Sequence, residues 1–273
     1  VFKNDLNNSE WIWTIQYANQ IQGGSTPNLI SWNYIPQYTV NTGDNYAVNM
    51  GGNGAGFVLM NTYFQSLFNN DPGDNRDSGT YYIMDYTYNN PAALPPGVKL
   101  GDTMRQWSEN SDDPSVRSQY YARLNPGCLK FVTWTGDPSQ AHQIKNLPVY
   151  RLAETYLIAG EANMHLGNTT LALQELNTVR ARANAQPLTT INQQVILDER
   201  ARELGFEGQR WYTLKRMGVL YNQITQHAGS ENANGVLFQA KAKTRFQPYM
   251  VNWPIPLAEM NVLGPSYPQN EGY

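Results

Sequence analysis

The stretch 199–216, ERARELGFEGQRWYTLKR, carries eight charged residues in eighteen positions, whereas only 15% of the whole chain is charged. Glu199, Glu203 and Glu207 recur at every fourth position and therefore share one face of a helix. Three basic side chains each lie three residues from one of these glutamates: Arg200, Arg202 and Arg210. Such spacing predicts either a catalytic acid–base pair or a structural cluster of ion pairs.

The structural interpretation of this cluster is favoured. Catalysis would need two carboxylates whose pKa values differ, whereas guanidinium partners keep glutamates ionised and occupied. Exposed pairs contribute only about 0.2–0.5 kcal/mol each, so such an arrangement matters chiefly where it is partly buried. We therefore expect the stretch 199–216 to clasp helices to the C-terminal segment, and we predict no catalytic residue in the chain.

Chain length, net charge and aromatic content limit the functions that the protein can have. A chain of 273 residues and 30.9 kDa is long enough for one large domain or two small ones. The net charge is −3 and the basic residues are scattered, which disfavours binding to nucleic acid phosphates. Aromatic residues reach 12%, which is high for an ordinary core, so part of the aromatic surface is expected on loops or exposed faces.

The cysteine count and the first residues argue against a disulfide, a thiolate metal site, a signal peptide and a membrane span. Cys128 is the single cysteine, so neither an intramolecular disulfide nor a thiolate metal site can form. The opening VFKNDLNNSEWIW has no signal-peptide pattern, and no eighteen apolar residues run together. We expect a chain that neither spans a membrane nor carries its own signal, and that is a processed or truncated piece of something longer.

The chain divides into a loop-rich region, 1–148, and a helical region, 149–273. The first is rich in Gly, Pro, Asn, Asp and Tyr, with short strands expected at 11–17 and 80–86. After the glycines of GGNGAG, the segment 57–68 has helical spacing and predicts one helix. We expect the loop-rich region to face the ligand.

The helical region predicts a tetratricopeptide-like hairpin from 148 to 185, closed by Gly167. The second helix of this hairpin buries Ala172, Leu176, Val179 and Ala183. A single hairpin cannot bury a continuous core, so it must dock on something else. A third helix is expected from Thr190, a fourth after Gly208 and a short one after Gly218, followed by an irregular, extended strap at 252–273.

Other motifs predict no cofactor and no metal site. The glycine run 51–56 lacks the ending of a P-loop and the spacing of a dinucleotide fingerprint, which indicates a flexible turn. His142, His165 and His227 are too widely separated for a zinc pair. The acidic turn Asp71, Asp74 and Asp77 could hold calcium, but without the loop glycine and terminal glutamate of an EF-hand a solvated turn is favoured.

Five phrases in this order resemble the C-terminal part of the SusD/RagB family: YRLAETYLIAGEAN, LNTVRARA, ERARELGFEGQRWYTLKR, NWPIP and the terminal QNEGY. Upstream, NSEWIWTIQY, GGNGAG and the DNR at 74–76 resemble the family less closely. The resemblance implies a mainly α fold with long loop-rich regions and a few short strands. It also implies that the N-terminal half of the family is absent and was the packing partner of the hairpin.

The resemblance further implies a surface-exposed outer-membrane lipoprotein that binds glycan or peptide without cleaving it. Its implied partners are the ligand, a SusC-like TonB-dependent transporter that receives it, and the N-terminal half as a separate chain. The lipid anchor would lie on that missing part. Glycan is the leading ligand, and a peptide-binding RagB-like receptor or a tetratricopeptide-type adaptor for protein partners are the alternatives. A glycoside hydrolase would need two free carboxylates in a cleft.

Candidate ligand-binding residues follow from the chemistry of sugars. Sugar rings stack their apolar faces on flat aromatic side chains, and polar side chains bind the hydroxyls at the edges. Three loops, 29–38, 79–90 and 101–110, supply such side chains: Trp32, Tyr34, Tyr38, Tyr81, Tyr82, Tyr86, Tyr88, Arg105 and Trp107. Packing within the loops is the alternative for any one of these aromatic rings.

Overall fold

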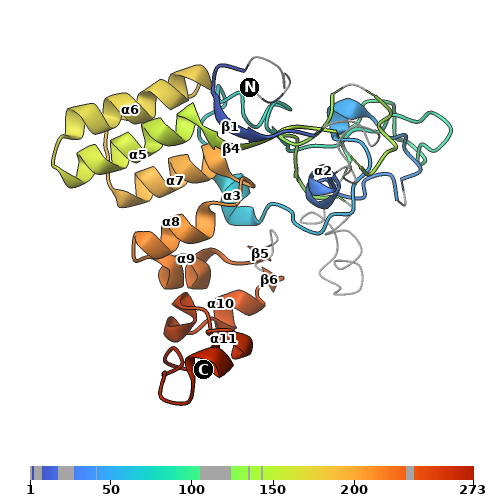
Figure 1. Cartoon of the computed structure of the whole chain (residues 1–273). Helices are drawn as coiled ribbons and strands as arrows, with labels where there is room; N and C mark the ends of the chain where they lie inside the picture. The colour runs from blue at the N-terminus through green and yellow to red at the C-terminus, as the bar shows by residue number, and fades with distance from the viewer. Residues whose placement is uncertain are drawn as a thin grey trace.

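The computed structural model describes residue 2 and the ranges 8–17, 28–40, 42–104, 124–134, 136–142, 144–231 and 237–273. The fold is mainly helical with a few short strands, as expected. A loop-rich body, a layer of helices beside it and a column of short helices towards the C-terminus follow one another (Figure 1). Within the ranges just given, no helix combines the length and apolar character that crossing a bilayer requires.

Two small antiparallel pairs organise the loop-rich body. Strand β1 (Trp11–Ile15) pairs with β4 (Leu147–Arg151), and β2 (Tyr82–Ile83) pairs with β3 (Gly127–Cys128). The β1–β4 pair joins the start of the chain to the entry of the helical region (Figure 1). The prediction that helix begins at Pro148 is therefore wrong, because the residues up to Arg151 pair with β1 and helix starts only at Leu152.

Short helices complete this body: α2 (Ile30–Tyr34), the 3₁₀ turn η1 (Val48–Met50) and α3 (Thr62–Ser66). Helix α3 is much shorter than the segment 57–68 that the spacing predicted. The side chain of Asn61 caps it by accepting from the Phe64 N–H at 2.9 Å. Before that cap, the Val58 N–H donates to the Asn33 carbonyl at 3.0 Å, so the chain there lies extended against α2 instead of coiling.

The helical layer contains the predicted hairpin, α5 (Leu152–His165) and α6 (Thr169–Arg182), with α7 (Gln193–Leu204) packed against it. Its core holds Leu157, Leu176 and Ile196, and the four predicted contact residues of the second helix are all buried. A Cβ at Gly160 would overlap the Leu176 side chain, so glycine allows the two helices to pack closely. Helix α7 is capped by Asn192 rather than by Thr190, since the Asn192 side chain accepts from the Val195 N–H.

The C-terminal column consists of short elements: α8 (Arg210–Arg216), α9 (Leu220–His227), the pair β5 (Ser230–Glu231) and β6 (Leu237–Phe238), α10 (Lys241–Arg245), η3 (Pro248–Val251) and α11 (Leu257–Leu263). The expected helices after Gly208 and Gly218 are α8 and α9. The expectation of an irregular tail is wrong at α11, which begins directly after Pro256. No residue of 237–273 is buried, and this part extends away from the loop-rich body (Figure 1).

Candidate functional site

The glutamates of 199–216 lie at the centre of a buried ion cluster. Glu203 accepts from Arg151 at 2.8 Å, from Arg182 at 2.6 Å and from Arg76 at 3.2 Å. Glu199 also accepts from Arg76, at 2.7 Å. Burial acts to raise the pKa of Glu203, but the surrounding guanidinium groups prevail and hold it well below its usual range. These carboxylates are ionised and paired with arginine side chains, which supports the structural interpretation of the cluster over the catalytic one.

The partners of this cluster differ from those the sequence suggested. Of the three nearby arginines, only Arg202 pairs with a glutamate of the same helix, Glu199, at 2.9 Å. The other partners come from distant parts of the chain: Arg76, Lys130, Arg151, Arg180 and Arg182. Within the residues that the structure describes, the ion pairs of this cluster join α7 to the loop-rich body and the hairpin, so the expectation of a charged clasp to the C-terminal segment is wrong. The contact of the stretch 199–216 with that segment is aromatic, since the Trp211 and Trp253 ring centroids lie 5.9 Å apart.

The acidic turn belongs to the same cluster. Asp74 lies 2.6 Å from Arg76, and Asp71 lies 2.6 Å from Arg180. Both carboxylates are buried. The prediction of a solvated turn is therefore wrong for Asp71 and Asp74, whose carboxylates pair with guanidinium groups through Asp74 Oδ2 and Asp71 Oδ2.

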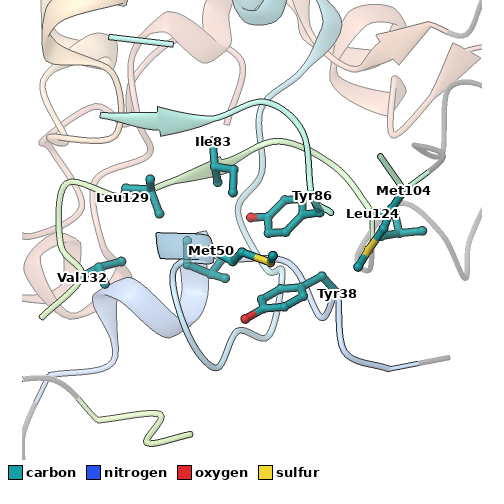
Figure 2. Packing of buried hydrophobic residues seen from close by; sticks show 9 residues of the cluster. Tyr38, Met50, Ile83, Tyr86, Met104, Leu124, Leu129 and Val132 are labelled. Carbon is teal, nitrogen blue, oxygen red and sulfur yellow. The ribbon is translucent and has the colours of Figure 1, made fainter. Parts of the chain in front are cut away.

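Four of the predicted ligand-stacking tyrosines lie in the core: Tyr38, Tyr81, Tyr82 and Tyr86, each at most 3% exposed. Figure 2 shows Tyr38 and Tyr86 among aliphatic side chains and methionines, and their rings stack with centroids 4.9 Å apart. The Tyr38 hydroxyl accepts from the Ala47 N–H at 2.9 Å, and burial raises the pKa of Tyr38 to about 12. These four rings are buried because the loops pack on one another. They were predicted from loop composition, which does not indicate how loops pack.

The remaining predicted residues are distributed as follows. Tyr34 is half-buried, with its ring against Phe131 and Phe206 at centroid distances of 5.6 and 5.1 Å. Tyr88 is half-buried beside the cluster of Figure 2. Arg105 and Trp107 lie outside the described residues. None of these placements tests a ligand contact, and all nine residues stay predictions.

Trp32 is the predicted residue that sits in a surface arrangement of aromatic rings. The Phe57 ring meets the Trp32 ring edge to face with centroids 5.4 Å apart, and Phe57 is 71% exposed. The sequence interpretation missed Phe57 because it placed this residue inside a helix. The signal that could have identified it is a bulky aromatic residue directly after a run of glycines.

The glycine run positions that pair. The Ala55 N–H donates to the Trp32 carbonyl at 2.7 Å, and the Gly56 N–H donates to the Ile35 carbonyl at 2.8 Å. A Cβ at Gly54 would overlap the Ile35 carbonyl oxygen, so only glycine allows the two segments to approach this closely. The run 51–56 is therefore a fixed platform against α2 and not the flexible turn that its composition suggested.

Two hollows lie beside α7 and α8. The smaller, about 480 Å³, is bounded by α3, α7, α8 and α9. The larger, about 1060 Å³, lies between the β1–β4 pair, α5 and α8. Arg200 lines both, and Tyr34 lines the larger one. The polar side chains of the larger hollow include acidic groups already engaged elsewhere, such as Glu161 with Arg216 and Glu207 with Arg151.

Comparison with known proteins identifies the family. The model of the SusD family matches residues 9–273. The starch-binding protein SusD of Bacteroides thetaiotaomicron is 33% identical over 154 residues, covering 53% of this chain and 26% of that protein. A SusD-like protein of Formosa agariphila is 35% identical over 142 residues, covering 47% of this chain and 25% of that protein.

Solved structures share the fold. A SusD homolog from Bacteroides thetaiotaomicron matches with a TM-score of 0.63 at 17% identity, covering 100% of this chain and 54% of that one. Surface glycan-binding protein A of the same organism matches with a TM-score of 0.61 at 22% identity, covering 99% and 54%. A laminarin-binding SusD-like protein matches at 0.57 and 23%, covering 99% and 51%. The chain thus spans about half the length of these structures.

Proposed function

We propose that this chain, which belongs to the SusD family, binds glycan at the cell surface and does not cleave it. The observation that carries the proposal is the contact between the exposed Phe57 ring and the half-buried Trp32 ring, held by the glycine platform on the loop-rich region. The starch-binding relative that is 33% identical supports glycan as the ligand class. Residues 1–148 form the ligand-facing region of this proposal, and residues 149–273 support it.

The geometry of the pair suits a sugar ring. An apolar sugar face stacks on an aromatic ring, and the Trp32 and Phe57 rings meet at 87° in an aromatic corner whose Phe57 ring is 71% exposed. The platform is rigid where the pair sits, since the Asn53 N–H donates to the Pro138 carbonyl at 2.8 Å and fastens it to a second loop. A rigid aromatic corner loses little conformational entropy when a ligand binds.

Binding serves delivery in this proposal. The chain hands its ligand to a SusC-like TonB-dependent transporter of the outer membrane, and a lipid anchor outside residues 1–273 holds it at the surface. The central carboxylates support a role without hydrolysis, because Glu199 and Glu203 are held by guanidinium groups and are buried. A glycoside hydrolase needs a pair of carboxylates that is free to exchange a proton and reach the sugar.

A ligand screen tests this function. The protein is titrated with starch, laminarin and a mixed peptide library, and binding is followed by calorimetry and tryptophan fluorescence. We expect heat and a fluorescence change with at least one polysaccharide, and none with the peptides. Binding of peptides alone would replace the proposal with a peptide receptor, no binding would favour an adaptor for protein partners, and release of reducing sugar would contradict the role without cleavage.

A further inference from the structure

The smaller hollow has mainly apolar walls. It is bounded by α3, α7, α8 and α9, and its volume is about 480 Å³. The apolar side chains that line it include Leu59, Phe64, Leu204, Phe206, Leu214 and Ile224. Sites for small molecules are typically hollows of about 300–1,000 Å³ with apolar walls and a few polar groups. The size and the lining of the smaller hollow fit that description.

The charged side chains of this lining are basic. Arg200 and Arg210 line the hollow, and no Asp or Glu does so among the residues that the structure describes. His227 also lines it, but burial lowers the pKa of His227, so its imidazole is neutral at pH 7. The hollow therefore carries the charge of two guanidinium groups, although the chain as a whole has a net charge of −3.

Arg210 is the cation that a ligand in the hollow can touch, because it is only half-buried. Its guanidinium donates to the Leu197 carbonyl at 2.6 Å and lies 3.4 Å from the Gln223 side-chain oxygen. Asp198 acts on Arg210 electrostatically, but its carboxylate accepts from the Tyr63 hydroxyl at 2.5 Å. Burial lowers the pKa of Arg210, so its neighbours stabilise the positive charge incompletely.

Arg200 adds a second positive charge at a deeper position. Its side chain is 5% exposed, and its Nη2 atom lies 3.1 Å from the Thr213 hydroxyl and 3.7 Å from Glu154. Nε and Nη1 have no hydrogen-bond partner among the described residues. A ligand does not reach these buried nitrogens. An anion in the hollow nevertheless lowers the cost of keeping the charge of Arg200 buried, because opposite charges attract strongly where water is excluded.

We propose that the smaller hollow binds a small amphiphilic carboxylate, whose charged end pairs with Arg210 and whose apolar chain lies among the apolar side chains of the wall. The planar guanidinium group of arginine matches a carboxylate in shape and charge. A neutral sugar fits less well, since its hydroxyls would lie unpaired against apolar side chains. Neither Trp32 nor Phe57 lines this hollow, so the inference does not depend on glycan binding at the aromatic corner.

Calorimetry with two small molecules tests the chemistry of the ligand. The protein, expressed from its complete reading frame, is titrated at neutral pH with octanoate and with 1-octanol, which has the same chain without the charge. We expect saturable binding of octanoate with a Kd at least about tenfold lower than that of octanol, the difference made by a hydrogen bond between charged groups. No saturable binding of octanoate, or equal affinity for the two molecules, would overturn the proposal.

Arginine variants test the contact. Arg210→Met is expected to weaken octanoate binding about tenfold and to leave octanol binding within about twofold, because only the carboxylate loses its partner. The matched control is Arg216→Met on the same helix, since Arg216 is paired with Glu161 and does not line this hollow. It is expected to keep the octanoate affinity of the wild type. Equal affinities in the two variants would refute the assigned role of Arg210.

A third variant tests the location and does not depend on the folding of Arg210→Met. Val58 lines the hollow and is 50% exposed, so Val58→Trp fills part of the hollow without a change in the buried core. We expect it to weaken octanoate and octanol alike, with an unchanged circular dichroism spectrum. Octanoate binding equal to that of the wild type would show that the hollow is not the site. Arg210→Met is also titrated with polysaccharide, and its glycan affinity is expected to stay unchanged, which separates this inference from the proposed function.

Discussion

Arg76 Nη1 lies 2.7 Å from Glu199 Oε1, although 123 residues separate them in the sequence. Neither side chain is more than 2% exposed. The contact joins the loop-rich body to helix α7, and Arg76 also binds Glu203 of the same helix. Buried ion pairs therefore fix the position of the loop-rich body relative to helix α7.

The buried ion cluster predicts a large loss of stability on removing one charge. Glu203→Gln keeps the shape of the side chain but leaves three guanidinium groups without that carboxylate. We expect the free energy of unfolding to fall by about 3–5 kcal/mol, since the remaining charges stay buried. Urea denaturation followed by circular dichroism measures it. Glu259→Gln, at an exposed position of α11, serves as control and is expected to change stability by less than about 0.5 kcal/mol.

The same cluster predicts a loss of stability in acid. Burial opposes ionisation of Glu199 and Glu203, but neighbouring arginines lower both pKa values below the usual 4.5 in the folded state. A carboxyl group whose pKa is lower in the folded state than in the unfolded state stabilises the fold at pH values above its unfolded pKa. This stabilisation is lost as the pH falls through the folded pKa. We expect the urea midpoint to fall from pH 4.5 downwards, with a shallower slope in Glu203→Gln. A midpoint that is constant between pH 5 and 3 would contradict the assigned pKa directions.

The aromatic corner predicts separate effects on binding and on stability. Phe57→Ala removes an exposed ring, so we expect an unfolding free energy within about 0.5 kcal/mol of the wild type. Glycan affinity is expected to fall by about 0.5–1.5 kcal/mol, or roughly two- to tenfold in Kd. Calorimetry with the best polysaccharide measures the change, and Tyr267→Ala, an exposed aromatic in the C-terminal part, is the control. Unchanged affinity in Phe57→Ala would move the site away from Trp32.

For a buried tyrosine we expect the opposite result, a loss of stability without a loss of glycan affinity. Tyr38→Phe leaves the Ala47 N–H without the hydroxyl that accepts from it at 2.9 Å. We expect a loss of about 1 kcal/mol in unfolding free energy, the cost of losing one hydrogen bond to a partly buried donor, and no change in glycan affinity. Thermal unfolding and calorimetry on the same preparation measure both quantities. A weaker affinity at full stability would support Tyr38 as a ligand contact.

The buried thiol of Cys128 is expected to react only when the protein unfolds. Burial raises its pKa to about 12, and its side chain is fully buried. Since only the thiolate reacts readily, we expect a disulfide reagent at pH 8 to label the native protein at least about a thousandfold more slowly than the protein in urea. The absorbance of the released thiol follows the reaction. Prompt labelling without denaturant would show that the β2–β3 region opens in the native state.

Local patterns in the sequence predicted the helical hairpin well and the burial and pairing of individual side chains poorly. Ala172, Leu176 and Val179 were predicted on one helix face and are buried there, because helical periodicity depends only on neighbours along the chain. The pairing of Arg182 with Glu203 was not predicted, since it depends on how α6 and α7 pack. Trp32 of α2 and Tyr38 lie six positions apart, and no local pattern indicates that Tyr38 is buried whereas Trp32 is only half-buried.

The sequence by itself determined the family, the helical hairpin and the charged character of helix α7, since these follow from order and spacing along the chain. The tertiary structure alone decided what the charges do. It brings Arg76, Lys130 and Arg151 from distant segments to the glutamates of α7, where burial makes pairing obligatory. It also decided that the Phe57 ring stays exposed, because hydrogen bonds between the glycine platform and the α2 segment place Phe57 against the half-buried Trp32.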